Sequence, residues 1–95
     1  MTQFREFLED QLRDPELRAE YDALEDEFSL VRALLDARRI SGLTQQELAE
    51  RTGMAQSDIS RLERGEGNPS LKTLRRLAAG MGMRVRIEFQ PASPA

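Results

Sequence analysis

Apolar residues recur at helical spacing through residues 28–82, and each apolar stretch is bounded by a helix-capping or helix-ending signal. A stripe that begins at Phe28 ends at Gly42, two shorter helices lie on either side of Gly53, and a fourth helix follows a cap at Ser70. The apolar side of this fourth helix consists of Leu71, Leu74, Leu77, Ala78 and Met81. Four such helices can surround one small core, so the pattern predicts an all-α domain.

The N-terminal third of the chain carries further apolar stripes. A short amphipathic helix is predicted from the helical spacing of Phe4, Phe7, Leu8 and Leu12. Asp14 suits a helix N-cap and Pro15 the first position of the next helix. That helix has its stripe at Leu17, Tyr21, Leu24 and Phe28. The acidic run at residues 25–27 is a potential break, so the sequence leaves open whether residues 15–40 form one helix or two.

The apolar period changes from helical to alternating near the C-terminus. Strict alternation over seven residues predicts a half-buried β-strand over residues 83–90, with residues 91–95 as a tail. Pro91 and Pro94 would end the strand. A lone strand leaves its backbone hydrogen bonds unpaired. We therefore expect Val85, Ile87 and Phe89 to pair with a second copy of the chain or with a different protein. The alternative is a tail packed loosely on the domain.

The two short helices around Gly53 carry the most specific pattern. Thr44 and Glu47 have the spacing of a capping box, in which each side chain accepts from the backbone N–H of the other. Leu43 and Leu48 fit the hydrophobic staple that accompanies such a cap. Gly53 follows the first helix where a left-handed residue lets the chain turn sharply. The pattern predicts a helix-turn-helix.

The outer face of the second helix has the chemistry of a base-reading surface. Ile59 and Leu62 fall on its core side, which leaves Gln56, Ser57, Ser60 and Arg61 outward. Gln can bond to adenine, Arg to guanine and Ser to either, and the start of this helix enters the major groove in helix-turn-helix proteins. An ordinary helical hairpin with a solvated polar face is the alternative. The complete pattern favours DNA binding.

Composition excludes several classes of function. The 95 residues include no cysteine and no histidine, so we expect no disulfide, no zinc or other metal site, no cofactor and no histidine-based catalysis. The acidic residues of the N-terminal third have no supporting lysine or histidine beside them, and we do not expect an enzyme such as a nuclease. No secretory signal or membrane-spanning run occurs, so we expect a cytoplasmic protein that does not bind membranes.

The net charge of −3 hides an uneven distribution. Residues 1–30 hold three basic and ten acidic side chains, a net charge of −7, whereas residues 31–95 hold eleven basic and seven acidic ones, a net charge of +4. Such an asymmetry predicts separate partners for the two parts. The basic part suits DNA, and the acidic part suits a basic protein.

From Phe28 to Met83 the chain resembles the XRE family of phage-repressor and Cro-type helix-turn-helix proteins. The resemblance rests on residues 43–49, Gly53, residues 59–65 and residues 68–71. It implies a five-helix, lambda-repressor-like domain over residues 28–82 that binds a pseudo-palindromic operator as a homodimer. The positions it places at base edges are Ala55, Gln56, Ser57, Ser60 and Arg61. Those it places at the DNA backbone are Thr44, Gln45, Asn68, Lys72 and Thr73.

The start of the second motif helix departs from this family. Ala55 stands at an N-cap position that is often Ser or Thr, and a missing cap costs about 0.5–2 kcal/mol. Asp58 is favourable near the helix N-terminus but brings a negative charge close to DNA. We therefore expect a structural role for Asp58 and a moderate affinity for the operator.

The flanking segments add a second resemblance, to HigA-type antitoxins that repress their own operons. It rests on residues 14–21 and residues 30–38, combined with the DNA-binding core and the terminal strand. It implies a partner that is a basic ribonuclease toxin of the RelE, HigB-like or ParE kind. Residues 1–27 would be the acidic toxin-binding arm, with contacts from Phe4, Phe7, Leu8, Leu12, Leu17, Tyr21 and Leu24. Two alternatives stay open: the apolar stripe packs back on its own domain, or the chain is a free-standing regulator.

Overall fold

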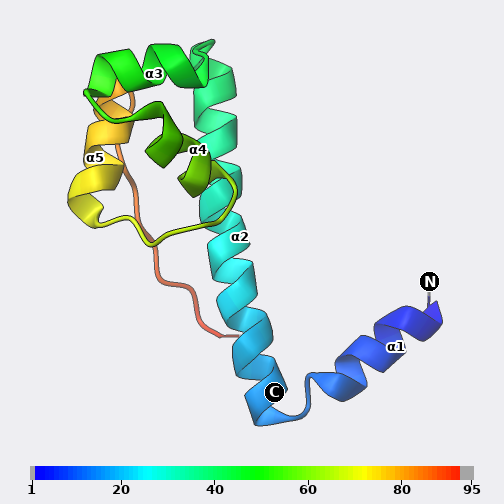
Figure 1. The fold of residues 1–95 in the computed structure, drawn as a ribbon. Coiled ribbons are helices and arrows are strands. Elements are labelled where there is room, and N and C mark those ends of the chain that lie inside the picture. Colours follow the sequence, from blue (N-terminus) through cyan, green and yellow to red (C-terminus); the bar gives the residue numbers. More distant parts are fainter. Residues whose placement is uncertain (1, 93–95) are drawn as a thin grey trace.

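The computed structural model describes residues 2–92 and contains five α-helices in that range, as expected for an all-α chain. They are α1 (Thr2–Gln11), α2 (Pro15–Ser41), α3 (Gln45–Thr52), α4 (Gln56–Glu63) and α5 (Leu71–Gly80). Figure 1 shows α3, α4 and α5 gathered at the C-terminal half of α2, while α1 extends away from the opposite end. Four helices form the domain: the C-terminal half of α2, α3, α4 and α5. The fifth helix, α1, belongs to the arm, together with the first half of α2.

Residues 15–41 form one long helix, α2, where the sequence left open one helix or two. Its 27 residues run without interruption through the acidic run and through the expected boundary between residues 27 and 28. The Asp14 carboxylate accepts from the Glu16 N–H at 2.9 Å, Pro15 occupies the first turn, and Gly42 ends the helix at φ 73°. At 1.5 Å per residue the helix is about 40 Å long. It runs continuously from the second half of the arm into the domain.

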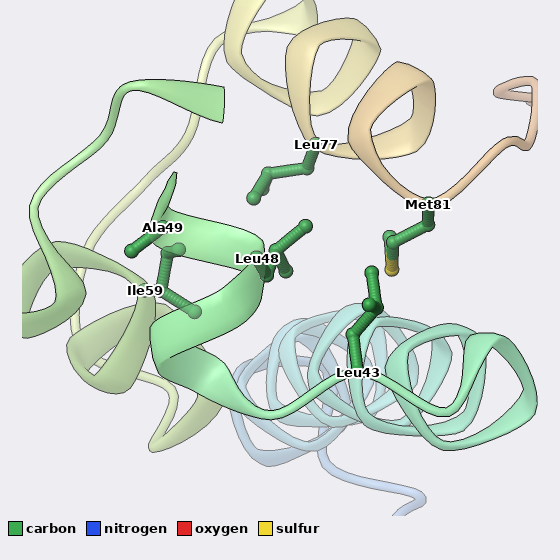
Figure 2. Packing of buried hydrophobic residues seen from close by; sticks show 6 residues of the cluster. All are labelled: Leu43, Leu48, Ala49, Ile59, Leu77 and Met81. Atoms are coloured by element: carbon green, nitrogen blue, oxygen red, sulfur yellow. The ribbon is translucent and has the colours of Figure 1, made fainter. Parts of the chain in front are cut away.

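The core lies where α3, α4 and α5 meet the end of α2. Figure 2 shows its cluster of buried side chains: Leu43, Leu48, Ala49, Ile59, Leu77 and Met81. Leu34 and Ala37, both half-buried residues of α2, pack against this cluster. Leu48 and Ile59 are each only 2% exposed, so α3 and α4 each contribute a fully buried side chain to this core.

A close contact brings α3 and α5 together at Gly80. A Cβ atom placed on Gly80 would lie 2.7 Å from Thr52 Cγ2 and 3.2 Å from Leu48 Cδ1. Van der Waals contact between carbon atoms begins at about 3.5 Å. Only glycine therefore allows this approach of the two helices.

The strand predicted over residues 83–90 is wrong for this structure. The described part of this segment forms no strand, and Figure 1 shows it running from α5 along α2. The alternation is present in the sequence, but within residues 2–92 no second extended segment pairs with it, and an unpaired strand is not stable alone. Pro94 and the end of the tail lie outside the described residues.

Within residues 2–92, no helix has the length and apolar character needed to cross a bilayer.

Candidate DNA interface

Local hydrogen bonds define both ends of α3 and the turn that follows it. The capping box at the start of α3 is present: the Glu47 N–H donates to Thr44 Oγ1 at 3.0 Å, and the Thr44 N–H donates to Glu47 Oε1 at 3.1 Å. At the other end Gly53 has φ 72° and its N–H donates to the Ala49 carbonyl. The helix and the glycine turn predicted from the sequence are confirmed.

Thr52 and Arg76 hold this turn from within the domain. The buried Thr52 hydroxyl donates to the Leu48 carbonyl at 2.8 Å and accepts from the Met54 N–H at 3.2 Å. Arg76 of α5 donates from Nε to the Thr52 carbonyl at 2.7 Å. The C-terminus of α3 is thus closed by a side chain from α5, and α4 begins at a defined point.

A buried ion pair anchors the other end of α4. The Glu63 side chain is 5% exposed, and Arg38 of α2 binds it with two hydrogen bonds, from Nε at 2.7 Å and from Nη2 at 2.9 Å. Arg38 also donates from Nη1 to the Leu43 carbonyl at 3.1 Å. The Gln45 amide donates to Glu63 Oε1 at 2.8 Å. This cluster joins α2, the loop before α3, α3 and α4, and Glu63 raises the pKa of the Arg38 guanidinium.

Sequence reasoning did not assign a role to Arg38 or Glu63, although the spacing held a signal. Glu63 lies four residues after the buried Ile59, so both fall on the core side of α4. A carboxylate on that side needs a cationic partner, because a buried unpaired charge is costly. Arg38, in the last turn of α2, supplies it.

The predicted base-contact positions line the free face of α4. Ala55, Gln56, Ser57 and Arg61 are exposed, and Ser60 is half-buried. Ala55 occupies the N-cap without a side-chain hydrogen bond, as expected. Two internal pairs occupy part of this face: Asp58 accepts from Arg61 Nη2 at 2.8 Å, and Ser60 accepts from Arg64 Nη1 at 2.8 Å. Arg64, which also pairs with Glu66 at 3.3 Å, was missed by the sequence analysis.

The predicted backbone-contact positions are divided among three places. Thr44 and Gln45 lie at the start of α3, where Thr44 serves as the cap and the Gln45 amide is engaged with Glu63. Asn68 is exposed in the loop that joins α4 to α5. Lys72 is exposed in the first turn of α5, next to the half-buried Thr73, whose N–H donates to Ser70 Oγ at 3.1 Å.

The apolar stripe of the arm is not covered by the domain. Phe4, Phe7 and Leu24 are 62–69% exposed and Leu17 is 40% exposed, while Leu8, Leu12 and Tyr21 are half-buried. Glu25 beside Tyr21 raises the pKa of its phenol. The alternative in which the stripe packs back on its own domain therefore does not describe these large side chains.

The side chains expected to pair in a dimer lie in the segment after α5. Val85 is half-buried, Ile87 is 59% exposed and Phe89 is 98% exposed. Gln90 lines a groove together with Tyr21, Leu24 and Phe28 of α2. The end of this segment thus lies beside the acidic half of the long helix.

Comparison with known proteins shows a match over the region just described. Residues 34–86 match the helix-turn-helix family. An HTH-type transcriptional regulator of Haemophilus influenzae is 32% identical over 81 residues, which are 85% of this chain and 74% of that protein. Antitoxin HigA1 of Mycobacterium tuberculosis is 34% identical over 77 residues, which are 81% of this chain and 52% of its own length. No solved structure matches the chain.

A third relative matches a shorter stretch of the chain at higher identity. The HTH-type transcriptional regulator y4dJ of Sinorhizobium fredii is 48% identical over 46 residues, which are 48% of this chain and 60% of that protein. The chain therefore spans about half the length of the HigA1 relative and somewhat more of the y4dJ protein.

Proposed function

The chain belongs to the helix-turn-helix family of DNA-binding transcriptional regulators, and from this premise we propose that it is the antitoxin of a type II toxin–antitoxin system. It represses its own operon in the cytoplasm as a homodimer on a pseudo-palindromic operator. Its acidic arm binds and neutralises a basic RelE- or HigB-like ribonuclease toxin. The family is one of regulators and not of enzymes, in agreement with the composition.

The observation that supports DNA reading is the division of α4 into a fixed and a free face. Ile59 and Glu63 hold the helix to the core, and Gln56, Ser57 and Arg61 point outward with hydrogen-bonding groups. These are side chains that bond to base edges in the major groove. Asn68 and Lys72 would add contacts to the phosphates on either side.

The observation that supports a protein partner is the uncovered apolar stripe of the arm. Its large side chains remain exposed beside an acidic surface, on a segment with a net charge of −7 over residues 1–30. Apolar contact supplies binding energy, and the negative charge accelerates association with a cationic protein. The likeness to antitoxin HigA1, which extends beyond the domain to 81% of this chain, supports the proposal that this partner is a toxin.

The test is a pull-down of the product of the neighbouring gene, followed by a gel shift on the DNA upstream of the operon. We compare Leu24→Asp with Ile40→Asp, because both replace an exposed aliphatic residue of α2 by a carboxylate, 64% and 77% exposed respectively. Leu24→Asp should abolish retention of the neighbour, whereas Ile40→Asp should retain it. Both variants should bind DNA like the wild type.

A free-standing regulator is the second candidate, since the Haemophilus influenzae regulator is as similar to this chain as HigA1 is. It predicts the same gel shift. It differs from the antitoxin in the pull-down: no neighbouring product would be retained, and deleting residues 1–27 would change neither growth nor repression. That result would be compatible with DNA binding and would refute the antitoxin role.

The homodimer makes a geometric prediction of its own. Two copies on one face of DNA should protect half-sites about 34–36 Å apart, one helical turn of the duplex. The exposed Ile87 and Phe89 provide apolar surface for the contact between copies. A monomer by light scattering at micromolar concentration would contradict the dimer.

A further inference from the structure

The recognition helix α4 uses its first acidic residue differently from α3. In α3 the third residue, Glu47, turns back and accepts from the N–H of the cap residue. Asp58 has the same position in α4, three residues after Ala55. Its carboxylate instead turns along the helix and accepts from Arg61 Nη2 at 2.8 Å. The acid therefore contacts the arginine of the free face and not the start of its own helix.

Folding stability gives little reason for this pair. The side chains of Arg61 and Asp58 are 58% and 52% exposed, and exposed ion pairs of this kind contribute little to stability. Its effect on the geometry of Arg61 is larger. A free arginine samples many rotamers, and a carboxylate one turn away restricts them before DNA arrives.

The pair leaves Arg61 able to read a base. A guanidinium has five N–H donors, and Asp58 engages one nitrogen, Nη2. The remaining donors are sufficient for the two hydrogen bonds that arginine makes to guanine O6 and N7. Asp58 stays satisfied while Arg61 is bound in this way.

The same carboxylate penalises other sequences. An ionised Asp only accepts hydrogen bonds, so turning Arg61 away to reach an acceptor elsewhere leaves the Asp58 carboxylate without its donor, and bases with fewer acceptors than guanine gain fewer hydrogen bonds from the held arginine. Specificity arises from this kind of unfavourable contact as well as from favourable ones.

We propose that Asp58 is a positioning residue for base readout, whose carboxylate orients Arg61 toward a guanine in the operator and disfavours other bases there. The proposal rests on the DNA-reading function proposed above. It replaces the purely structural role that the sequence indicated for Asp58.

The experiment selects bound sites from a random duplex library with the full chain and measures base preference at each position. Wild type should select a guanine in each half-site. Asp58→Asn should lower the preference for that guanine by about tenfold, the lower end of what a bidentate arginine contact supplies. Arg61→Ala should remove the preference, and Asp58→Asn should have no further effect on it in the Arg61→Ala background. Asp58→Glu should restore part of the preference.

The matched control is Glu66→Gln. Glu66 is an exposed acid next to α4 whose side chain pairs with Arg64 at 3.3 Å, while its contact with Arg61 is a backbone bond, from the Glu66 N–H to the Arg61 carbonyl. Replacing its side chain therefore removes one negative charge and leaves the Arg61 guanidinium and its bond to Asp58 in place. It should leave the guanine preference unchanged. Thermal unfolding followed by circular dichroism should show that Asp58→Asn and Glu66→Gln fold like the wild type.

The outcomes separate this proposal from the one on which it rests. If Asp58→Asn weakens binding equally to operator and random DNA, or acts just as strongly without Arg61, the positioning role is refuted and DNA reading by α4 stands. If the wild-type chain selects no sequence at all, the DNA-reading function itself fails and the role of Asp58 fails with it.

Discussion

Replacing Arg38 by methionine should destabilise the domain severely, because it removes the cation from a buried pair and keeps the anion. Glu63 is only 5% exposed and would keep one partner, the Gln45 amide. Breaking a buried pair from one side costs about 3–5 kcal/mol. A 95-residue chain has a total stability of roughly 5–14 kcal/mol, so the loss takes a large share of it.

Urea unfolding followed by circular dichroism measures this loss. With a slope of about 1 kcal/mol per molar urea, as expected for a chain of this size, the midpoint should fall by about 3 M or more. Arg39→Met is the matched control, since it removes the same charge from an exposed position one residue later. It should change stability by less than about 0.5 kcal/mol.

A double replacement tests whether the unpaired charge of Glu63 causes this loss of stability. Arg38→Met combined with Glu63→Met removes both charges and fills the site with apolar side chains of similar length, which is often neutral for buried pairs. The double variant should therefore recover most of the stability lost by Arg38→Met. If its loss equals the sum of the two single losses, or if Arg38→Met costs below about 1 kcal/mol, the argument from an uncompensated buried charge is refuted.

Three further predictions concern other parts of the domain. Gly80→Ala should lower the melting temperature, because the new methyl group would meet Thr52 at 2.7 Å and overpacking costs about 1–3 kcal/mol. A rise in the melting temperature, as for an ordinary helical Gly→Ala exchange, would contradict this close contact. The capping bonds from Thr44 lower the pKa of Glu47, so its contribution to stability is present above the unfolded pKa of about 4.3 and is lost as the pH falls through the lower folded value. Glu47→Gln should therefore flatten stability against pH in that acidic range, and an unchanged profile would contradict the capping box. Lys72→Ala should weaken binding equally on all DNA sequences and reduce the salt dependence, and a change in base preference would argue against a phosphate contact.

Local signals predicted the parts of the fold that local bonds determine. The capping box of Thr44 and Glu47 and the turn at Gly53 need only residues a few positions apart, and all are present as predicted. The continuity of α2 was left open because residues 25–27 suggested a break. No proline or glycine lies between Glu16 and Ser41, so the helix had no strong reason to end there.

The strand over residues 83–90 shows what a period cannot determine. Alternation states which side chains share a face, but a strand also needs a partner for its backbone. Phe89, which the pattern places on the buried face, is 98% exposed in the single chain. The sequence therefore identified an apolar face without the surface that would cover it.

The free face of α4 could be predicted by residue type but not by contact. Helical spacing places Arg61 within reach of Asp58, and Ser60 within reach of Arg64, as i,i+3 and i,i+4 neighbours. Spacing alone does not say whether these groups bond to each other or stay free for DNA. Both pairs form in the free chain, and both leave capacity for a base contact: the Ser60 hydroxyl accepts from Arg64 and can still donate, and Arg61 has unused donors. Because both arginines are exposed, breaking either pair costs little stability, so the DNA sequence, and not folding, decides which contacts persist.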